Sequence, residues 1–307
     1  MTQIILPQQD TFGTFTEGYI PFGYNGEHFE TYYKIYGTLE DRTRNPLVIF
    51  HAGPGLVHNY LGPMADLVKT HNIPVILYDQ LGNGRSTHLK GKPKEFWTID
   101  VFMDQMDSLI QYLGIGESFD LLGHSSWGGI CGSEYAVRKQ PPGLKHLVLA
   151  NATPSMDLWV QSMLQLLKEF PPEIEEDIKG GFKNPAAYYK ALQIFQAKHA
   201  CIVKPWPTDI VETMEAVFGP EGDITVSSAG QVSFVTPSGL RTNWTIIERL
   251  HTIKVPTLVV NGALDIAQDF IPKAKWIRFE DGSAMPMWED RERFIQILGD
   301  FLTADLD

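Results

Sequence analysis

The stretch "LLGHSSWGG", residues 121–129, decides how this chain folds. It follows a short apolar run and precedes a segment of helical composition. A serine between two small residues at a sharp strand-to-helix turn, in the pattern G-x-S-x-G, is typical of a nucleophile elbow. Here the pattern holds one residue too many, because Gly123 lies two positions before Ser125 whereas Gly128 lies two positions after Ser126. The sequence therefore predicts an elbow and leaves two candidate serines.

Short apolar runs and helical patterns alternate on both sides of the elbow. Continuous apolar runs are typical of strands buried on both faces of a sheet. Apolar residues at helical spacing over 99–113 and 291–302 predict two amphipathic helices. Strands that alternate with helices favour a mostly parallel sheet in an α/β protein. The predicted strands are 31–36, 46–50, 74–78, 119–122, 145–150, 256–261 and 275–279.

The composition changes in the middle of the chain. Residues 153–250 are rich in Trp, Met and Phe, with helical patches separated by Pro-rich breaks such as "EFPPEIEED". We interpret this segment as a helical cap inserted into the sheet domain. The predicted organisation is a core of residues 1–152 and 251–307 with a cap of residues 153–250.

Charge and composition limit the partners. The 307 residues carry a formal net charge of -12, which argues against nucleic acid and anionic membranes as main partners. No apolar stretch approaches the roughly 18–20 residues of a membrane span. The beginning "MTQIILPQQD" has no export signal pattern, so we expect a cytoplasmic protein whose two cysteines, Cys131 and Cys201, are buried free thiols.

Two further motifs suit acyl-transfer chemistry. "HAGPG", residues 51–55, follows a predicted strand, and a Gly-rich turn there can present backbone N–H groups to an oxyanion. The predicted oxyanion residues are Gly53, Ala52 and Trp127, with an ordinary connecting turn as the alternative. Asp265 follows a late strand and could orient a catalytic base, although Asp also commonly caps a helix.

Taken in order, these motifs resemble the α/β-hydrolase fold, and more closely the proline iminopeptidase group with its fungal amino-acid amidase relatives. The resemblance covers nearly the whole chain and implies a hydrolase with an inserted helical cap. It is carried by "HAGPG" (51–55), "YDQLGNGRST" (78–87), "EFWTID" (95–100), "GHSSWGGICGSEYA" (123–136), "GLKHLVLANATPSMDLW" (143–159), "KHACIVKPWP" (198–207), "PTLVVNGALDIAQD" (256–269) and "MPMWEDRERF" (285–294).

The departures from the family pattern bear on mechanism. The family elbow has one serine; its helix-side register, kept by Trp127-Gly128-Gly129, favours Ser126 as the nucleophile, whereas the strand-side register names Ser125. Ala284 stands where the family places its catalytic histidine, and Ala52 replaces a glycine. Ile202 replaces an arginine of the cap, and the connection between 265 and 275 is shorter than usual.

The missing histidine limits the chemistry. Removing the base from a Ser-His-Asp triad costs on the order of 10⁶ in rate. We therefore expect an enzyme that uses non-acyl-enzyme chemistry, such as isomerisation, cyclisation, elimination or C–C cleavage. The alternatives are a serine amidase, aminopeptidase or esterase whose histidine was replaced by Ala284, and a non-catalytic small-molecule binding protein.

The expected substrate is a small, largely apolar metabolite. Because Ile202 replaces the cap arginine, recognition of a free amino group is not expected. The sequence shows no metal-ligand spacing and no dinucleotide fingerprint, so no metal and no cofactor are expected, and the oligomeric state is left open. The residues predicted to bind the substrate are His58, Trp127, Trp159, His199 and Trp206.

Overall fold

A mixed nine-stranded sheet forms the centre of the molecule in the computed structural model, which describes residues 7–264 and 274–304. The strand order is β1-β2-β3-β5-β4-β6-β7-β10-β11. Strands β5, β4, β6, β7, β10 and β11 run parallel to one another, whereas β1, β2 and β3 pair antiparallel at one edge and β3 also pairs antiparallel with β5. The bounds are β1 Gln8–Gln9, β2 Thr14–Tyr24, β3 Glu27–Tyr36, β4 Leu47–Phe50, β5 Val75–Tyr78, β6 Phe119–His124, β7 Leu144–Ala150, β10 Thr257–Gly262 and β11 Lys275–Phe279.

The parallel strands form because their apolar runs bury both faces of the sheet. In β4, Val48 and Phe50 belong to one core cluster, whereas Leu47 and Ile49 belong to the other. Alternate side chains of a strand point to opposite faces, so a continuous apolar run serves both clusters. In contrast, β11 is an edge strand whose side chains are largely exposed, so the expectation of a buried strand at 275–279 was wrong.

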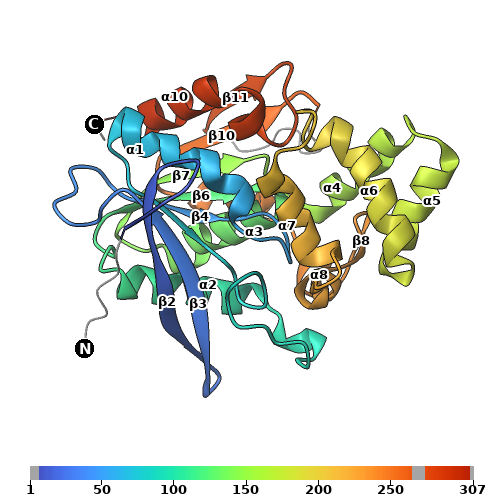
Figure 1. The fold of residues 1–307 in the computed structure, drawn as a ribbon, viewed down its shortest axis with the longest axis horizontal. Helices are drawn as coiled ribbons and strands as arrows, with labels where there is room; N and C mark the ends of the chain where they lie inside the picture. The colour runs from blue at the N-terminus through green and yellow to red at the C-terminus, as the bar shows by residue number, and fades with distance from the viewer. Residues whose placement is uncertain (1–6, 265–273, 305–307) are drawn as a thin grey trace.

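Helices cover both faces of the sheet. Figure 1 shows α1 and α10 on one side of the strands and α2 on the other. The predicted helices over 99–113 and 291–302 agree with α2 and α10. The bounds of the helices and short helical turns that pack on the sheet are η1 Asn59–Ala65, α1 Asp66–His71, η2 Lys94–Phe96, α2 Ile99–Tyr112, α3 Ser125–Glu134, η3 Tyr135–Lys139, α9 Pro286–Glu289 and α10 Arg291–Leu302.

The chain between β7 and β10 is mainly helical and lies to one side of the sheet (Figure 1). It includes the short hairpin β8-β9, which the sequence patterns did not predict. The division into a core and a cap at 153 and 250 remains a prediction. The elements of this segment are α4 Met156–Leu167, α5 Pro172–Gly180, η4 Gly181–Lys183, α6 Pro185–His199, α7 Thr208–Phe218, α8 Thr225–Gly230, β8 Gln231–Ser233, β9 Thr236–Pro237, η5 Gly239–Arg241 and η6 Ile247–Thr252.

Candidate active site

The turn from β6 into α3 holds one serine in a left-handed backbone conformation. Ser125 has φ +62°, and α3 begins at this residue. Non-glycine residues rarely adopt this conformation, and such strain is typical of functional sites, including the nucleophile of an elbow. Ser126 is the second residue of the helix and is not among the positive-φ residues. The backbone geometry therefore favours Ser125, the strand-side candidate, over Ser126, which the helix-side register favours.

The elbow holds an extra residue because its close backbone contact is made one position later along α3 than the G-x-S-x-G pattern places it. A Cβ added to Gly123 would lie 2.3 Å from the carbonyl oxygen of Gly128. Gly128 itself packs against the end of β4, where an added Cβ would lie 2.3 Å from the Phe50 carbonyl oxygen. The second small residue of the elbow is thus three positions after Ser125, and Trp127 takes the position that the G-x-S-x-G pattern gives to glycine.

Trp127 is a packing residue in this structure. Its ring is fully buried, and its Nε1 donates a hydrogen bond of 2.7 Å to Gln80 Oε1. Its indole also lies beside the turn at Gly53, where an added Cβ would approach Trp127 Cδ1 to 3.0 Å. The indole does not line the cavity described below, contrary to the expectation that Trp127 contacts the substrate. The indole packs beside Gly53 and Gln80 instead, which explains why it does not reach the cavity.

The "HAGPG" turn follows β4, as expected for an oxyanion turn, but one of its predicted donors is already used. The Ala52 N–H donates a hydrogen bond of 2.8 Å to Tyr60 Oη, so it is not available to a ligand. Gly53 remains as the donor that the turn can offer. The second donor follows the elbow serine: backbone N–H groups in the first turn of a helix lack intrahelical partners, so Ser126 N–H is available if Ser125 is the nucleophile.

His124 bridges the elbow and Ala284, the residue predicted to stand at the family's histidine position. Its Nε2 donates to the carbonyl oxygen of Ala284 over 2.9 Å, which leaves Nδ1 to accept a hydrogen bond of 2.9 Å from Tyr60 Oη. Burial lowers the pKa of His124 to about 4. The ring is therefore neutral at physiological pH, and both of its nitrogens are engaged.

The other histidines near the site are also held by hydrogen bonds. His51 donates through Nδ1 to the Ala52 carbonyl oxygen and accepts through Nε2 from Gln80 N–H. His58 donates through Nδ1 to the buried carboxylate of Asp79 at 2.8 Å. His199 donates through Nδ1 to the Leu264 carbonyl oxygen. None of these three histidines lines the cavity. The prediction that His58 and His199 contact a ligand there therefore does not agree with where the two side chains lie.

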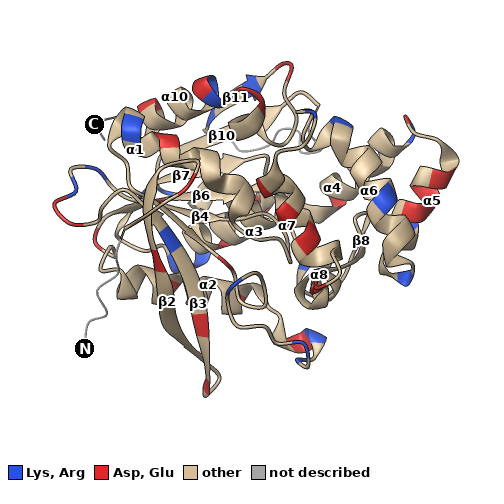
Figure 2. Ribbon diagram, viewed as in Figure 1, with Lys and Arg blue, Asp and Glu red and all other residues tan. Residues whose placement is uncertain are grey.

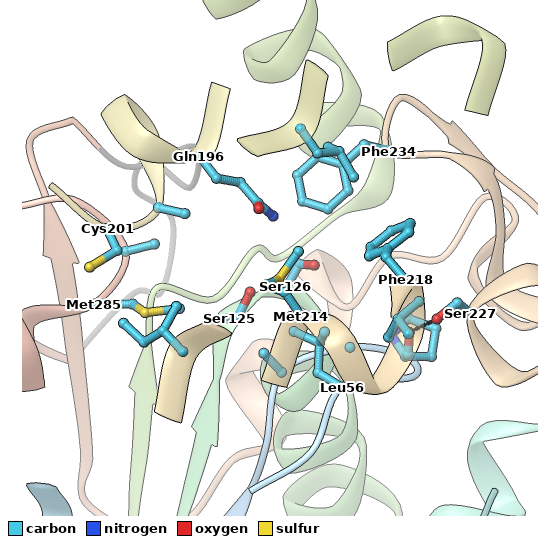
Figure 3. Close-up of a pocket in the computed structure, with 18 of the residues that line it drawn as sticks. Leu56, Ser125, Ser126, Gln196, Cys201, Met214, Phe218, Ser227, Phe234 and Met285 are labelled. Carbon is cyan, nitrogen blue, oxygen red and sulfur yellow. Dashed lines mark hydrogen bonds between the residues drawn. The ribbon is translucent and has the colours of Figure 1, made fainter. Parts of the chain in front are cut away.

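A largely apolar cavity opens beside the elbow, with a volume of about 920 Å³ including its mouth. Ser125 and Ser126 lie among apolar side chains in the close-up, with Gln196 on one side (Figure 3). Trp159 and Trp206, two of the residues predicted to bind the substrate, line the cavity, and Ala284 lines it too. The sequence patterns did not predict several other lining residues, including Gln196, Ser227, Gln231 and Phe234.

The cavity wall carries no acidic side chain among the described residues. Its thiol, Cys201, has its pKa raised to about 11 by burial and is protonated at neutral pH. Asp265, the predicted orienting acid, lies outside the described residues. Figure 2 shows acidic residues, in red, on elements such as α5 and α7.

The described residues include neither a metal-binding group nor a membrane-spanning helix. Within residues 7–264 and 274–304, no group of three or more His, Cys, Asp or Glu could hold a metal ion. In the same ranges, every helix is too short or too polar to cross a membrane. Both cysteines are buried and free, which confirms the expectation of unpaired thiols.

The sheet order and the sharp strand-to-helix turn at the end of β6 define an α/β-hydrolase fold, and residues 45–192 match the family described as "alpha/beta hydrolase fold". Proline iminopeptidase of Clostridium botulinum is 32% identical over 94% of this chain and 99% of its own length. The enzyme of that name from Clostridioides difficile is 31% identical with the same coverage.

Solved structures agree with this assignment. The crystal structure of VinJ matches with a TM-score of 0.82 and 35% identity, over 93% of this chain and 97% of that one. Proline iminopeptidase from Mycobacterium smegmatis matches with a TM-score of 0.78 and 32% identity, with the same coverage. The chain therefore belongs to the proline iminopeptidase family of α/β-hydrolase-fold enzymes.

Proposed function

We propose that this member of the family acts on a small, largely apolar metabolite by chemistry that forms no acyl-enzyme. The observation that carries the proposal is the lack of a free base beside Ser125. All nine histidines of the chain fall within the described residues, and His124 is the one that lines the cavity. Its Nε2 is bound to Ala284 and its Nδ1 to Tyr60.

A serine hydroxyl without a base is a weak nucleophile. The function of the site then rests on positioning and on stabilisation of negative charge at oxygen. We assign the donors to the N–H groups of Gly53 and Ser126, two residues that line the cavity together with Ser125. An enolate or alkoxide that forms during isomerisation, cyclisation, elimination or C–C cleavage needs this stabilisation as much as a tetrahedral intermediate does.

The apolar walls support the substrate class. Trp159, Phe182, Phe218 and Phe234 contribute aromatic surface to the cavity. They come from the segment 153–250, which supports its interpretation as a cap over the elbow. An aromatic or aliphatic skeleton of metabolite size would displace water from such walls.

One observation favours a second candidate function. Ala284 lines the cavity, so a histidine at this position would face the elbow. The chain would then be a serine amidase, aminopeptidase or esterase that has lost its base. A non-catalytic binding protein is the third possibility, because the cavity can hold a ligand whether or not it reacts.

Serine labelling tests the proposal. The protein is treated with a fluorophosphonate probe, and the labelled residue is identified by mass spectrometry. We expect no stoichiometric labelling within hours for the natural chain, because no base activates Ser125. The Ala284→His variant is expected to gain labelling at Ser125, with Ser125→Ala and Ser126→Ala in that background as matched controls. Rapid labelling of either serine in the natural chain would overturn the proposal.

Turnover distinguishes the alternatives. L-Proline p-nitroanilide and short p-nitrophenyl esters are assayed with the natural chain and with Ala284→His. Efficient hydrolysis of the anilide by Ala284→His alone would favour the amidase that lost its histidine. Efficient hydrolysis by the natural chain would contradict the proposed chemistry directly.

A further inference from the structure

A buried arginine that has no carboxylate partner among the described residues lies beside the elbow. Arg241 is 1% exposed, and no salt bridge pairs it with a carboxylate of the described residues. Its hydrogen bonds go to neutral groups: Nη1 donates to Gln231 Oε1 at 2.7 Å, and Nη2 donates to Ser126 Oγ at 3.2 Å. Its Nε is buried without a partner. Buried charges are normally paired, so an uncompensated one points to a partner that arrives with the ligand.

The guanidinium keeps its charge despite this burial. Desolvation lowers the pKa of Arg241 to about 10, so the group is protonated at neutral pH. Its charge therefore contributes a positive potential to the neighbouring cavity wall, where two of its three hydrogen-bond acceptors, Ser126 and Gln231, are lining residues; the third is Met156 Sδ.

Hydrogen-bond geometry determines what these two residues can offer a ligand. Gln231 uses its amide oxygen to accept from Arg241, which leaves its Nε2 to donate. Ser126 Oγ accepts from Arg241, which leaves its O–H to donate. Neither Gln231 Nε2 nor the Ser126 hydroxyl donates to any side chain of the described residues. The wall in front of Arg241 thus presents donors backed by a positive charge.

We propose that the cavity binds an organic acid, and that Arg241, acting through the Ser126 hydroxyl and the Gln231 amide, holds the carboxylate of the substrate beside Ser125. This inference rests on the proposed function in one respect, namely that the cavity is the substrate site. It refines the expected metabolite to an apolar skeleton with one anionic group. A positive charge beside the cavity and the lack of an acidic residue among the described lining residues both favour an anionic group over a free amine.

Calorimetry with three compounds of one carbon skeleton tests the proposal without turnover. The probes are 4-phenylbutanoate, 4-phenylbutan-1-ol and 4-phenylbutylamine. The natural chain is expected to bind the acid at least about 10-fold tighter than the alcohol, and the amine most weakly, since a charged hydrogen bond in a desolvated site outweighs a neutral one. Equal affinities for acid and alcohol would overturn the proposal.

Two variants assign the preference to Arg241. Arg241→Met is expected to reduce acid binding about 10- to 100-fold while alcohol binding changes less than about threefold, in line with the usual strength of a charge-assisted contact. Arg241→Lys is expected to keep part of the preference. Arg138→Gln removes an exposed arginine outside the cavity and serves as the charge-matched control, which should bind like the natural chain. An acid preference that survives in Arg241→Met would contradict the assignment.

A second route covers the case in which Arg241→Met does not fold. Gln231→Glu places a carboxylate at the Nη1 of Arg241 and neutralises the guanidinium in place, so the acid preference should disappear and amine binding should improve. Met214→Trp fills the cavity and should abolish binding of all three probes. If Met214→Trp leaves acid binding unchanged, the acid binds elsewhere and the proposal fails. Fluorophosphonate labelling reports on the reaction class independently, so either proposal can fail without the other.

Discussion

His124 Nε2 donates a hydrogen bond of 2.9 Å to the backbone carbonyl oxygen of Ala284, the residue predicted to stand at the family's histidine position. The residue just before the elbow serine is therefore tied to the loop that would carry the catalytic base. On its other side, His124 accepts from Tyr60, whose hydroxyl in turn accepts from Ala52 N–H. This chain of hydrogen bonds links the "HAGPG" turn, the elbow and the loop at Ala284. Both ring nitrogens of His124, the histidine that lines the cavity, are therefore used in structural hydrogen bonds.

Replacing His124 should destabilise the protein. His124→Phe leaves the hydroxyl of Tyr60 and the carbonyl of Ala284 without their partner in a buried site, and each lost partner costs about 1–3 kcal/mol. The free energy of unfolding, measured by urea denaturation at pH 7, should fall by about that amount or more. His251→Phe, at an exposed position, is the matched control and should change little. A His124→Phe variant as stable as the natural chain would contradict the bridging role.

Stability should depend on pH through two buried histidines. Burial lowers the pKa of His51 and of His124 to about 4, below the usual value of 6.5. Between these values the unfolded state binds more protons than the folded state, so the free energy of unfolding rises with pH. This stability is present above about pH 6.5 and is lost as the pH falls toward 4. Urea titrations at pH 7, 5.5 and 4.5 should show the fall, and His124→Phe should make it less steep.

Glycine and alanine should rank oppositely at the two elbow serines. At Ser125 the left-handed conformation costs a residue with a Cβ roughly 1–2 kcal/mol, so Ser125→Gly should be more stable than Ser125→Ala. At Ser126, within α3, glycine is about 1 kcal/mol less favourable than alanine, so the order should reverse. Melting temperatures of the four variants test this. The same order at both positions would place the elbow elsewhere.

Both thiols should be unreactive in the folded protein. Burial raises the pKa of Cys201 to about 11 and that of Cys131 well above its usual value, so little thiolate exists at pH 8. Iodoacetamide should label neither residue in native buffer and both in urea, as read by mass spectrometry. Labelling of Cys201, which lines the cavity, should increase steeply toward pH 10. Rapid native labelling of Cys201 at pH 8 would show that its thiol is not desolvated.

Asp265 should matter only where a histidine is present. The acid of a triad orients and stabilises an imidazolium, and its loss costs about 10⁴ in a working site. In the natural chain, Asp265→Asn should leave fluorophosphonate labelling as slow as before. In the Ala284→His background, the same substitution should reduce the gained labelling rate by several orders of magnitude. An equal effect in both backgrounds would show that Asp265 acts on the serine by another route.

Much of the fold was readable from the sequence because the pattern of a buried parallel strand is local. The predicted strand at 46–50 agrees with β4, and the helix at 291–302 agrees with α10, since each carries its own apolar periodicity. The edge strand β11 misled the prediction, because local hydrophobicity does not reveal whether a neighbouring strand covers it. The antiparallel strand β2, with its mixed polar and apolar residues, had no comparable signal.

Part of the candidate site could likewise be predicted from the sequence, and part of it depends on the folded structure. By itself, the sequence predicted that an elbow follows the strand at 119–122, that this elbow holds two serines, and that Ala284 stands at the family's histidine position. Only the tertiary structure decided which serine takes the left-handed conformation, because that depends on where Gly128 meets the backbone of β4. Arg241 is 115 residues from Ser126 in the chain, and no local pattern predicts that contact. Burial and hydrogen-bond partners arise from packing between distant segments, so the charge behind the elbow appears only when the chain is folded.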